Sequence, residues 1–131
     1  FLAALRYTIP AMPTHHQHMM HLCERLLTGA HALPNVRVLG KPGVEGRIPV
    51  VALDFSGFDN ALVTDRLAHE YGIATRCGLQ CSPSSHHTLG SYPQGAVRFS
   101  IGISNTMEDI EQTLTALETI VTNRRSFSQA E

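Results

Sequence analysis

The sequence predicts an α+β domain in which a small, mostly antiparallel sheet carries helices packed on one face. Two segments repeat apolar residues at three- and four-residue steps, as amphipathic helices do. Shorter apolar or alternating segments lie between turn-forming residues, as is typical of strands. The resulting order is helix, strand, strand, helix, strand, loop, strand, helix. At 131 residues the chain is long enough to bury one core of its own.

The first helix is predicted over residues 14–29. Its apolar residues recur along one stripe, Thr14 is a suitable N-cap, and Gly29 is a suitable stop. Residues 1–13 begin within a helical pattern and are interpreted as the end of a preceding helix and a linker. The domain itself is therefore expected to comprise residues 14–131.

Two strands and a second helix are predicted next. Residues 35–40 alternate, whereas residues 48–56 are apolar nearly throughout, which favours a strand covered on both faces. The Gly- and Pro-rich residues between them suit a connector. The second helix is predicted over residues 59–71, with Asp59 as its cap and Gly72 as its stop.

The third strand is predicted at residues 72–76, and it leads into a loop over residues 75–91. This loop is too rich in Gly, Ser and Pro to predict a regular helix. Residues 95–104 alternate again and are predicted to form the fourth strand.

The last helix is predicted over residues 105–125, with Asn105 or Thr106 as its cap. Acidic residues lie in its first turn, and Arg124 and Arg125 lie in its last turn. Both placements suit the helix dipole.

Charge and composition exclude some classes of partner. Ten basic residues nearly balance eleven acidic ones, which gives no electrostatic footprint for nucleic acid or an anionic membrane. No apolar run approaches the roughly 20 residues that span a bilayer. Three cysteines are an odd number, which favours reduced thiols. We therefore expect a cytoplasmic protein that binds neither nucleic acid nor membrane.

Cysteine and histidine side chains first suggest a metal site. Cys77, Cys81 and His86 offer three ligands at short spacings, although C-x3-C is not the usual zinc spacing and no second ligand pair lies nearby. Four histidines near the start of the first helix lack an Asp, Glu or Cys on the same face, so they are interpreted as solvated. They are His15, His16, His18 and His21.

A reactive thiol is the alternative interpretation of the loop. Cys81 has Arg76 before it and His86 after it, and cationic neighbours favour the nucleophilic thiolate. From spacing alone, a reactive thiol and an ordinary loop cysteine both stay open. Cys23 falls on the apolar stripe of the first helix and is expected to be a core residue.

Two basic residues bear on the same question. Lys41 is the only lysine and lies in a turn, so we expect it to be solvated and not to form a Schiff base. Arg98 lies in an otherwise apolar alternation. Its side chain either points to solvent or grips a carboxylate through two parallel hydrogen bonds.

Residues 72–111, GIATRCGLQCSPSSHHTLGSYPQGAVRFSIGISNTMEDIE, combine these features in one order. They resemble the C-terminal small domain of pyridoxal-phosphate enzymes of the class V aminotransferase fold, particularly cysteine desulfurases and selenocysteine lyases. The matching pattern is an R-x-G-x-x-C-x-P loop, a His, a Leu-Gly pair, a G-x-V-R-x-S strand and an Asn-Thr-capped helix. Residues 1–9 resemble, more loosely, the end of the large domain of these enzymes, and residues 15–27 resemble the connecting helix.

The resemblance implies a role for each candidate residue. In such desulfurases the loop cysteine attacks the sulfur of a cysteine substrate, which leaves alanine and an enzyme persulfide. Cys81 matches this nucleophile, and Arg98 matches the arginine that grips the substrate carboxylate. Arg76 matches the arginine at the loop entrance, and His86 matches a supportive loop histidine. Cys77 matches no role, although its spacing permits a disulfide with Cys81.

The resemblance also implies partners. Pyridoxal phosphate is bound mainly by the large domain, which supplies the Schiff-base lysine, so the present chain is expected to be inactive alone and to carry no cofactor-binding or metal-binding residues. The expected partners are that large domain, a second subunit, a cysteine-like amino acid and a sulfur-acceptor protein. Three alternatives stay open: another class V enzyme (a lyase, epimerase or aminotransferase), a stand-alone Cys/His metal-binding module, and a noncatalytic interaction domain.

Overall fold

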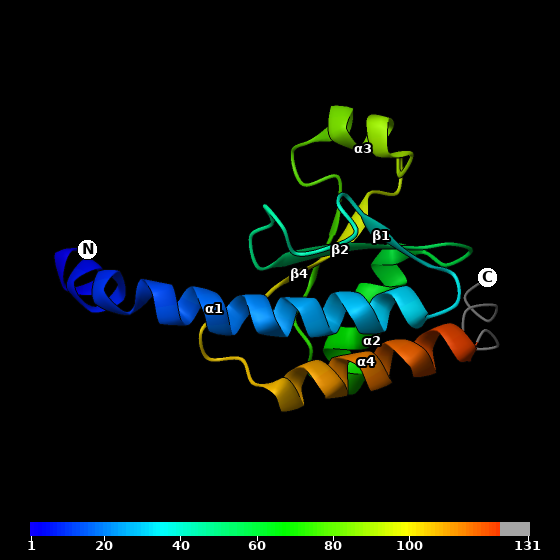
Figure 1. Cartoon of the computed structure of the whole chain (residues 1–131). Helices are drawn as coiled ribbons and strands as arrows, with labels where there is room; N and C mark the ends of the chain where they lie inside the picture. Colours follow the sequence, from blue (N-terminus) through cyan, green and yellow to red (C-terminus); the bar gives the residue numbers. More distant parts are fainter. Residues whose placement is uncertain (124–131) are drawn as a thin grey trace.

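A computed structural model describes residues 1–123 of the chain. The four strands form one sheet in the order β1-β2-β4-β3, and each neighbouring pair is antiparallel. Helices α1, α2 and α4 cover one face of this sheet, whereas α3 stands on the opposite side (Figure 1). The predicted fold class is therefore confirmed. The elements are α1 (Leu2–Ala32), β1 (Val36–Leu39), β2 (Val50–Phe55), α2 (Asn60–Tyr71), β3 (Arg76–Gly78), α3 (Pro83–Leu89), β4 (Ala96–Ser100) and α4 (Met107–Thr122).

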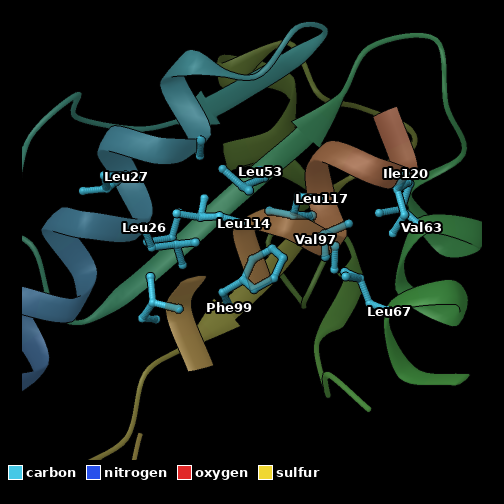
Figure 2. Close-up of a cluster of buried hydrophobic side chains, with 14 of the residues drawn as sticks. Leu26, Leu27, Leu53, Val63, Leu67, Val97, Phe99, Leu114, Leu117 and Ile120 are labelled. Atoms are coloured by element: carbon cyan, nitrogen blue, oxygen red, sulfur yellow. The ribbon is translucent and has the colours of Figure 1, made fainter. Parts of the chain in front are cut away.

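The core lies between the sheet and the three helices that cover it. Alternate residues of β2 and β4, such as Leu53 and Val97, are fully buried because successive side chains of a strand point to opposite faces. Each contributes about 1.5–3 kcal/mol by leaving water. Figure 2 shows them among leucines and isoleucines of the helices. The labelled core side chains are Leu26, Leu27, Leu53, Val63, Leu67, Val97, Phe99, Leu114, Leu117 and Ile120.

The second face of the sheet is less covered than the sequence predicts. In β2, the residues between the buried ones, such as Ala52 and Asp54, are half-buried. The expectation that both faces of this strand are covered is therefore wrong within this chain. The reason is that α1, α2 and α4 all pack against the same face (Figure 1). We call the other face, which carries Arg37, Ala52, Asp54, Arg76 and Arg98, the open face.

Helix α1 differs from its prediction at both ends. It is continuous from Leu2 to Ala32, so Thr14 is not its N-cap and Gly29 is not its stop. An N-cap residue needs non-helical backbone angles, and here the residues before and after Thr14 are all helical. A Cβ atom at position 29 would lie 2.5 Å from the Leu114 side chain, so this glycine permits close packing of α1 on α4. None of the described helices is both long and apolar enough to cross a membrane.

The caps of α2 and α4 are confirmed. Asp59 accepts a hydrogen bond from the Ala61 N–H at 2.7 Å, and Gly72 ends α2 in the left-handed conformation, with φ +69°. Thr106 caps α4 and forms a capping box with Asp109. The basic last turn predicted for α4 lies outside the described residues.

The segment between α2 and β4 differs most from its prediction. The third strand begins at Arg76 and ends at Gly78, so it lies farther along the chain than expected. The following loop contains a helix, α3, where no regular helix was predicted. Pro83 suits the first turn of a helix, Gly90 ends it with φ +66°, and no breaker lies between them. The proline and glycine therefore mark the two ends of a short helix and do not prevent it.

Candidate functional site

Two arginines face each other on the open face of the sheet. Arg76 of β3 lies directly opposite Arg98 of β4 in the strand register, so both side chains leave the sheet on the same side. Val97 and Phe99, the neighbours of Arg98, point the other way into the core. Like charges placed directly opposite in an antiparallel pair repel each other. A bound anion would relieve that repulsion.

Arg98 has an unused hydrogen-bond donor. Its side chain is half-buried, and its Nε is enclosed without a hydrogen-bond partner among residues 1–123. An enclosed N–H without an acceptor is unfavourable. The residue opposite Arg98 on β2 is Ala52, whose side chain offers no hydrogen-bond acceptor. The arrangement suits an external carboxylate, which a guanidinium binds through two hydrogen bonds.

Cys81 stands on a tight turn between β3 and α3. Its side chain is exposed, and the Ser82 N–H donates to the Leu79 carbonyl at 2.9 Å to close the turn. Gln80 and Cys81 both have positive φ, +50° and +63°. Non-glycine residues in this conformation store strain, and such residues cluster at functional sites. The turn therefore holds a free thiol out toward solvent.

His86 is buried in the last turn of α3, with 8% of its surface exposed. Its Nδ1 and the Ser91 hydroxyl are hydrogen-bonded at 2.7 Å, and its carbonyl accepts from the Ser91 and Tyr92 N–H groups. His87 stacks on the ring of Tyr92 with 3.8 Å between ring centroids. These contacts fix the residues that follow α3 against the helix.

The other two cysteines lie on the helix side of the sheet. Cys77 is opposite Val97 and packs half-buried against the core. Cys23 is fully buried in α1, as predicted, and burial raises the pKa of its thiol, so it stays neutral. The structure therefore does not bring Cys77, Cys81 and His86 together as ligands. Within residues 1–123, no group of three or more His, Cys, Asp or Glu side chains is arranged to hold a metal ion.

The remaining candidates of the sequence take part in local structure. His18 of α1 is hydrogen-bonded through Nε2 to the Asn105 carbonyl at 2.8 Å, which links α1 to the start of α4. Lys41 is exposed in the connector between β1 and β2, and its carbonyl accepts from the Arg47 guanidinium.

Two further residues of the site have no signal in the sequence. Arg37 of β1 binds the end of α3, and Asp54 of β2 binds Arg37. In an alternating strand, a polar residue simply predicts a solvent-facing position. Their role depends on the path of the loop across the open face, which no local pattern specifies.

The class-V aminotransferase family model matches residues 1–113. The chain belongs to the class-V aminotransferase family. Enzymes of this family use pyridoxal phosphate, whose ring acts as the electron sink of the reaction. The resemblance of residues 72–111 to the small domain of these enzymes is thereby confirmed.

Several curated members of the family are similar to the chain. It is 33% identical over 101 residues to a probable cysteine desulfurase of Pseudomonas putida, covering 77% of this chain and 23% of that protein. It is 29% identical over 136 residues to the cysteine desulfurase IscS of Clostridium botulinum, covering 95% of this chain and 34% of that protein. The chain thus spans about a third or less of the length of these relatives.

Solved structures share the fold. The cysteine desulfurase of Thermococcus onnurineus matches with a TM-score of 0.84 and 24% identity, over 92% of this chain and 30% of that one. The cysteine desulfurase CsdA of Escherichia coli matches with a TM-score of 0.78 and 23% identity, over 92% of this chain and 29% of that one. At these identities the likeness concerns the fold alone.

Proposed function

We propose that this chain is the small-domain portion of a pyridoxal-phosphate-dependent cysteine desulfurase, with residues 1–13 as the connection to the large domain. Cys81 is the nucleophile that takes up sulfur. Arg98 and Arg76 bind the carboxylate of the amino-acid substrate, and His86 supports the loop. The observation that carries the proposal is an exposed thiol on a strained turn, next in the chain to a strand whose Arg76 pairs with the unsatisfied Arg98.

The residues of the chain fit the substrate end of the cofactor complex. The unsatisfied Nε of Arg98 suits the carboxylate of an amino acid held on the cofactor. The chain offers no suitable lysine for the aldehyde group of pyridoxal phosphate, because its only lysine is exposed in the connector. The large domain therefore has to supply the lysine and most cofactor contacts, and the chain alone is inactive.

Cys81 performs the sulfur transfer. Its thiolate forms an S–S bond to the sulfur of the substrate cysteine while the substrate C–S bond breaks, leaving its electron pair on carbon. Pyridoxal phosphate, when bound, supplies an electron sink for this reaction. Addition of a proton to that carbon gives alanine, and Cys81 keeps the sulfur as a persulfide. The exposed position of Cys81 lets a sulfur-acceptor protein reach it afterwards.

The arginine pair orients the substrate. Binding the carboxylate between Arg76 and Arg98 fixes one end of the amino acid on the open face and leaves the sulfur end free to meet the turn. A homodimer, in which a second subunit completes the site, is part of the proposal. The cytoplasm, where thiols stay reduced, is the compartment that suits this chemistry.

The proposal is tested by joining the chain to the large domain of its own protein and measuring alanine release from L-cysteine. Cys81→Ala removes the nucleophile and is expected to lower alanine release by at least about a hundredfold. Cys77→Ala is the matched control, since this half-buried thiol faces the helix side of the sheet. It is expected to release alanine within about twofold of the unsubstituted enzyme. Equal release by the Cys81→Ala enzyme and the unsubstituted enzyme would show that Cys81 is not the nucleophile.

A further inference from the structure

The loop that carries Cys81 crosses the open face from one sheet edge to the other. It leaves β3, which is one edge strand, and the far end of α3 is bound to β1, which is the opposite edge strand. The chain then returns through Gly95 into β4, between them. We call residues 79–94 the arch. In Figure 1 the arch stands on the side of the sheet away from α1 and α4.

Arg37 is the contact that holds the far end of the arch. Its Nη1 donates to the Leu89 carbonyl at 2.7 Å, and its Nη2 donates to the Gly90 carbonyl at 2.9 Å. These carbonyls end α3, where the helix dipole is negative and a cation is favoured. The rigid fork of a guanidinium serves both carbonyls at once, which a lysine ammonium cannot reproduce.

Arg37 is itself held by Asp54, which the buried Asn60 holds in turn. Its Nη2 also donates to the Asp54 carboxylate at 2.8 Å, and the Asn60 amide donates to the other oxygen of Asp54 at 3.2 Å. Asn60 is completely buried, accepts from the Phe55 N–H and donates to the Gly95 carbonyl at 3.1 Å. The same network thus fixes the end of α3 and the point where the arch re-enters the sheet.

Apart from its connection to β3, the half of the arch that carries Cys81 has no such anchor among the described residues. Among residues 1–123, the hydrogen bonds of residues 79–82 stay within residues 76–86. They are the Gln80 side chain to the Arg76 carbonyl, the Ser82 N–H to the Leu79 carbonyl, the Ser82 hydroxyl to Ser85, and the His86 N–H to the Ser82 carbonyl. The position of the thiol above the sheet therefore depends on β3 at one end of the arch and on where α3 is tied at the other.

We propose that Arg37 is a positioning residue for Cys81, and the inference rests on the function proposed above. By fixing the end of α3 to the open face, Arg37 sets the distance between the thiol and the substrate held at Arg98. Arg37 does not touch the substrate in this account. We call the hydrogen bonds from Arg37 to the Leu89 and Gly90 carbonyls the tether. Loss of the tether therefore slows sulfur transfer and leaves binding of the amino acid intact.

The test uses the enzyme joined to its large domain and the variant Arg37→Met. We expect kcat for alanine release to fall about tenfold, because small misplacements of a reacting group are costly. KM for cysteine stays within about twofold, and the amide hydrogens of residues 84–90 exchange about tenfold faster. Arg37→Lys keeps the charge and restores part of kcat. An unchanged kcat, or a rise in KM with an unchanged kcat, would overturn the proposal.

A matched control separates positioning from general stability. Arg25→Met removes another exposed arginine that bridges distant elements, since Arg25 binds Glu111 of α4 through two hydrogen bonds of 2.6 and 2.7 Å. This variant is expected to keep kcat and the amide exchange rates of residues 84–90. An equal loss of kcat in the Arg25→Met enzyme would overturn the positioning role. Absence of alanine release from the unsubstituted enzyme would instead refute the proposed function, and unchanged exchange in the Arg37→Met enzyme would then still refute the tether.

Discussion

At the scale of single residues, the candidate site brings two positively charged arginines together. Arg76 and Arg98 lie directly opposite each other, although like charges in this position destabilise an antiparallel pair. Within the described residues, the Arg98 Nε has no acceptor to offset that cost. In the proposed function, binding of the substrate carboxylate offsets both costs.

Arg98→Lys is the direct test of this role. Lysine keeps the charge but loses the second parallel hydrogen bond, which is worth about 1.5–3 kcal/mol when one partner is charged. The enzyme joined to its large domain is therefore expected to show a KM for cysteine about tenfold to a hundredfold higher.

Arg66→Lys is the control for Arg98→Lys, because Arg66 pairs with Glu70 on the surface of α2. Its KM should match that of the unsubstituted enzyme. If Arg98→Lys lowered kcat with KM unchanged, the carboxylate assignment would be wrong.

At the scale of elements, the start of α4 is set by a charged cap. The Thr106 N–H donates to the Asp109 carboxylate at 2.9 Å, and the Asn105 amide donates to it as well. The hydrogen bond from the Thr106 backbone is the main cause that lowers the pKa of Asp109 below its usual range. Because this pKa is lower in the folded chain than in the unfolded chain, the stabilisation is present above the unfolded pKa. It is lost as the pH falls through the folded pKa.

Asp109→Asn is expected to remove this part of the acid sensitivity. The variant is less stable than the unsubstituted chain at neutral pH, and the difference shrinks as the pH falls through the lowered pKa of Asp109. Urea unfolding at a series of pH values measures this difference. Glu108→Gln, in the same turn but outside the capping box, serves as the control. A stability difference between Asp109→Asn and the unsubstituted chain that stays constant with pH would contradict the assignment.

Local signals predict some of these elements and miss others. The caps at Asp59 and Thr106 are set by nearby backbone donors, so the sequence predicts them correctly. Gly29 fails as a stop signal because its role is the distant contact with Leu114. Arg98, Arg76 and Cys81 are identified as candidates from spacing and resemblance, yet the facing of the two arginines follows from strand register. The tether at Arg37 depends on residues 52 and 53 positions away in sequence, which no short pattern contains.

At the scale of the whole molecule, the hydrophobic core lies on one side of the sheet and the proposed site lies on the open face. Helices α1, α2 and α4 bury one side of the sheet, and the arch stands on the other side (Figure 1). Strand register places Arg76 and Arg98 together on that open face. Leu53 belongs to that core and is completely buried. Leu53→Ala is expected to lower the free energy of unfolding of the chain by about 2–5 kcal/mol, as measured in urea. Leu62→Ala, at an exposed position of α2, should change it by no more than about 0.5 kcal/mol, and equal losses would place Leu53 outside the core.

The central claim is that Cys81 accepts sulfur from a cysteine substrate. The measurement that tests it most directly is mass spectrometry of peptides from the enzyme joined to its large domain, after brief exposure to L-cysteine without a sulfur acceptor. The account predicts one added sulfur atom on the peptide that contains Cys81, and none after the Arg98→Gln substitution at low cysteine concentration. Alanine release with the added sulfur on Cys77, or with no sulfur on either residue, would contradict it.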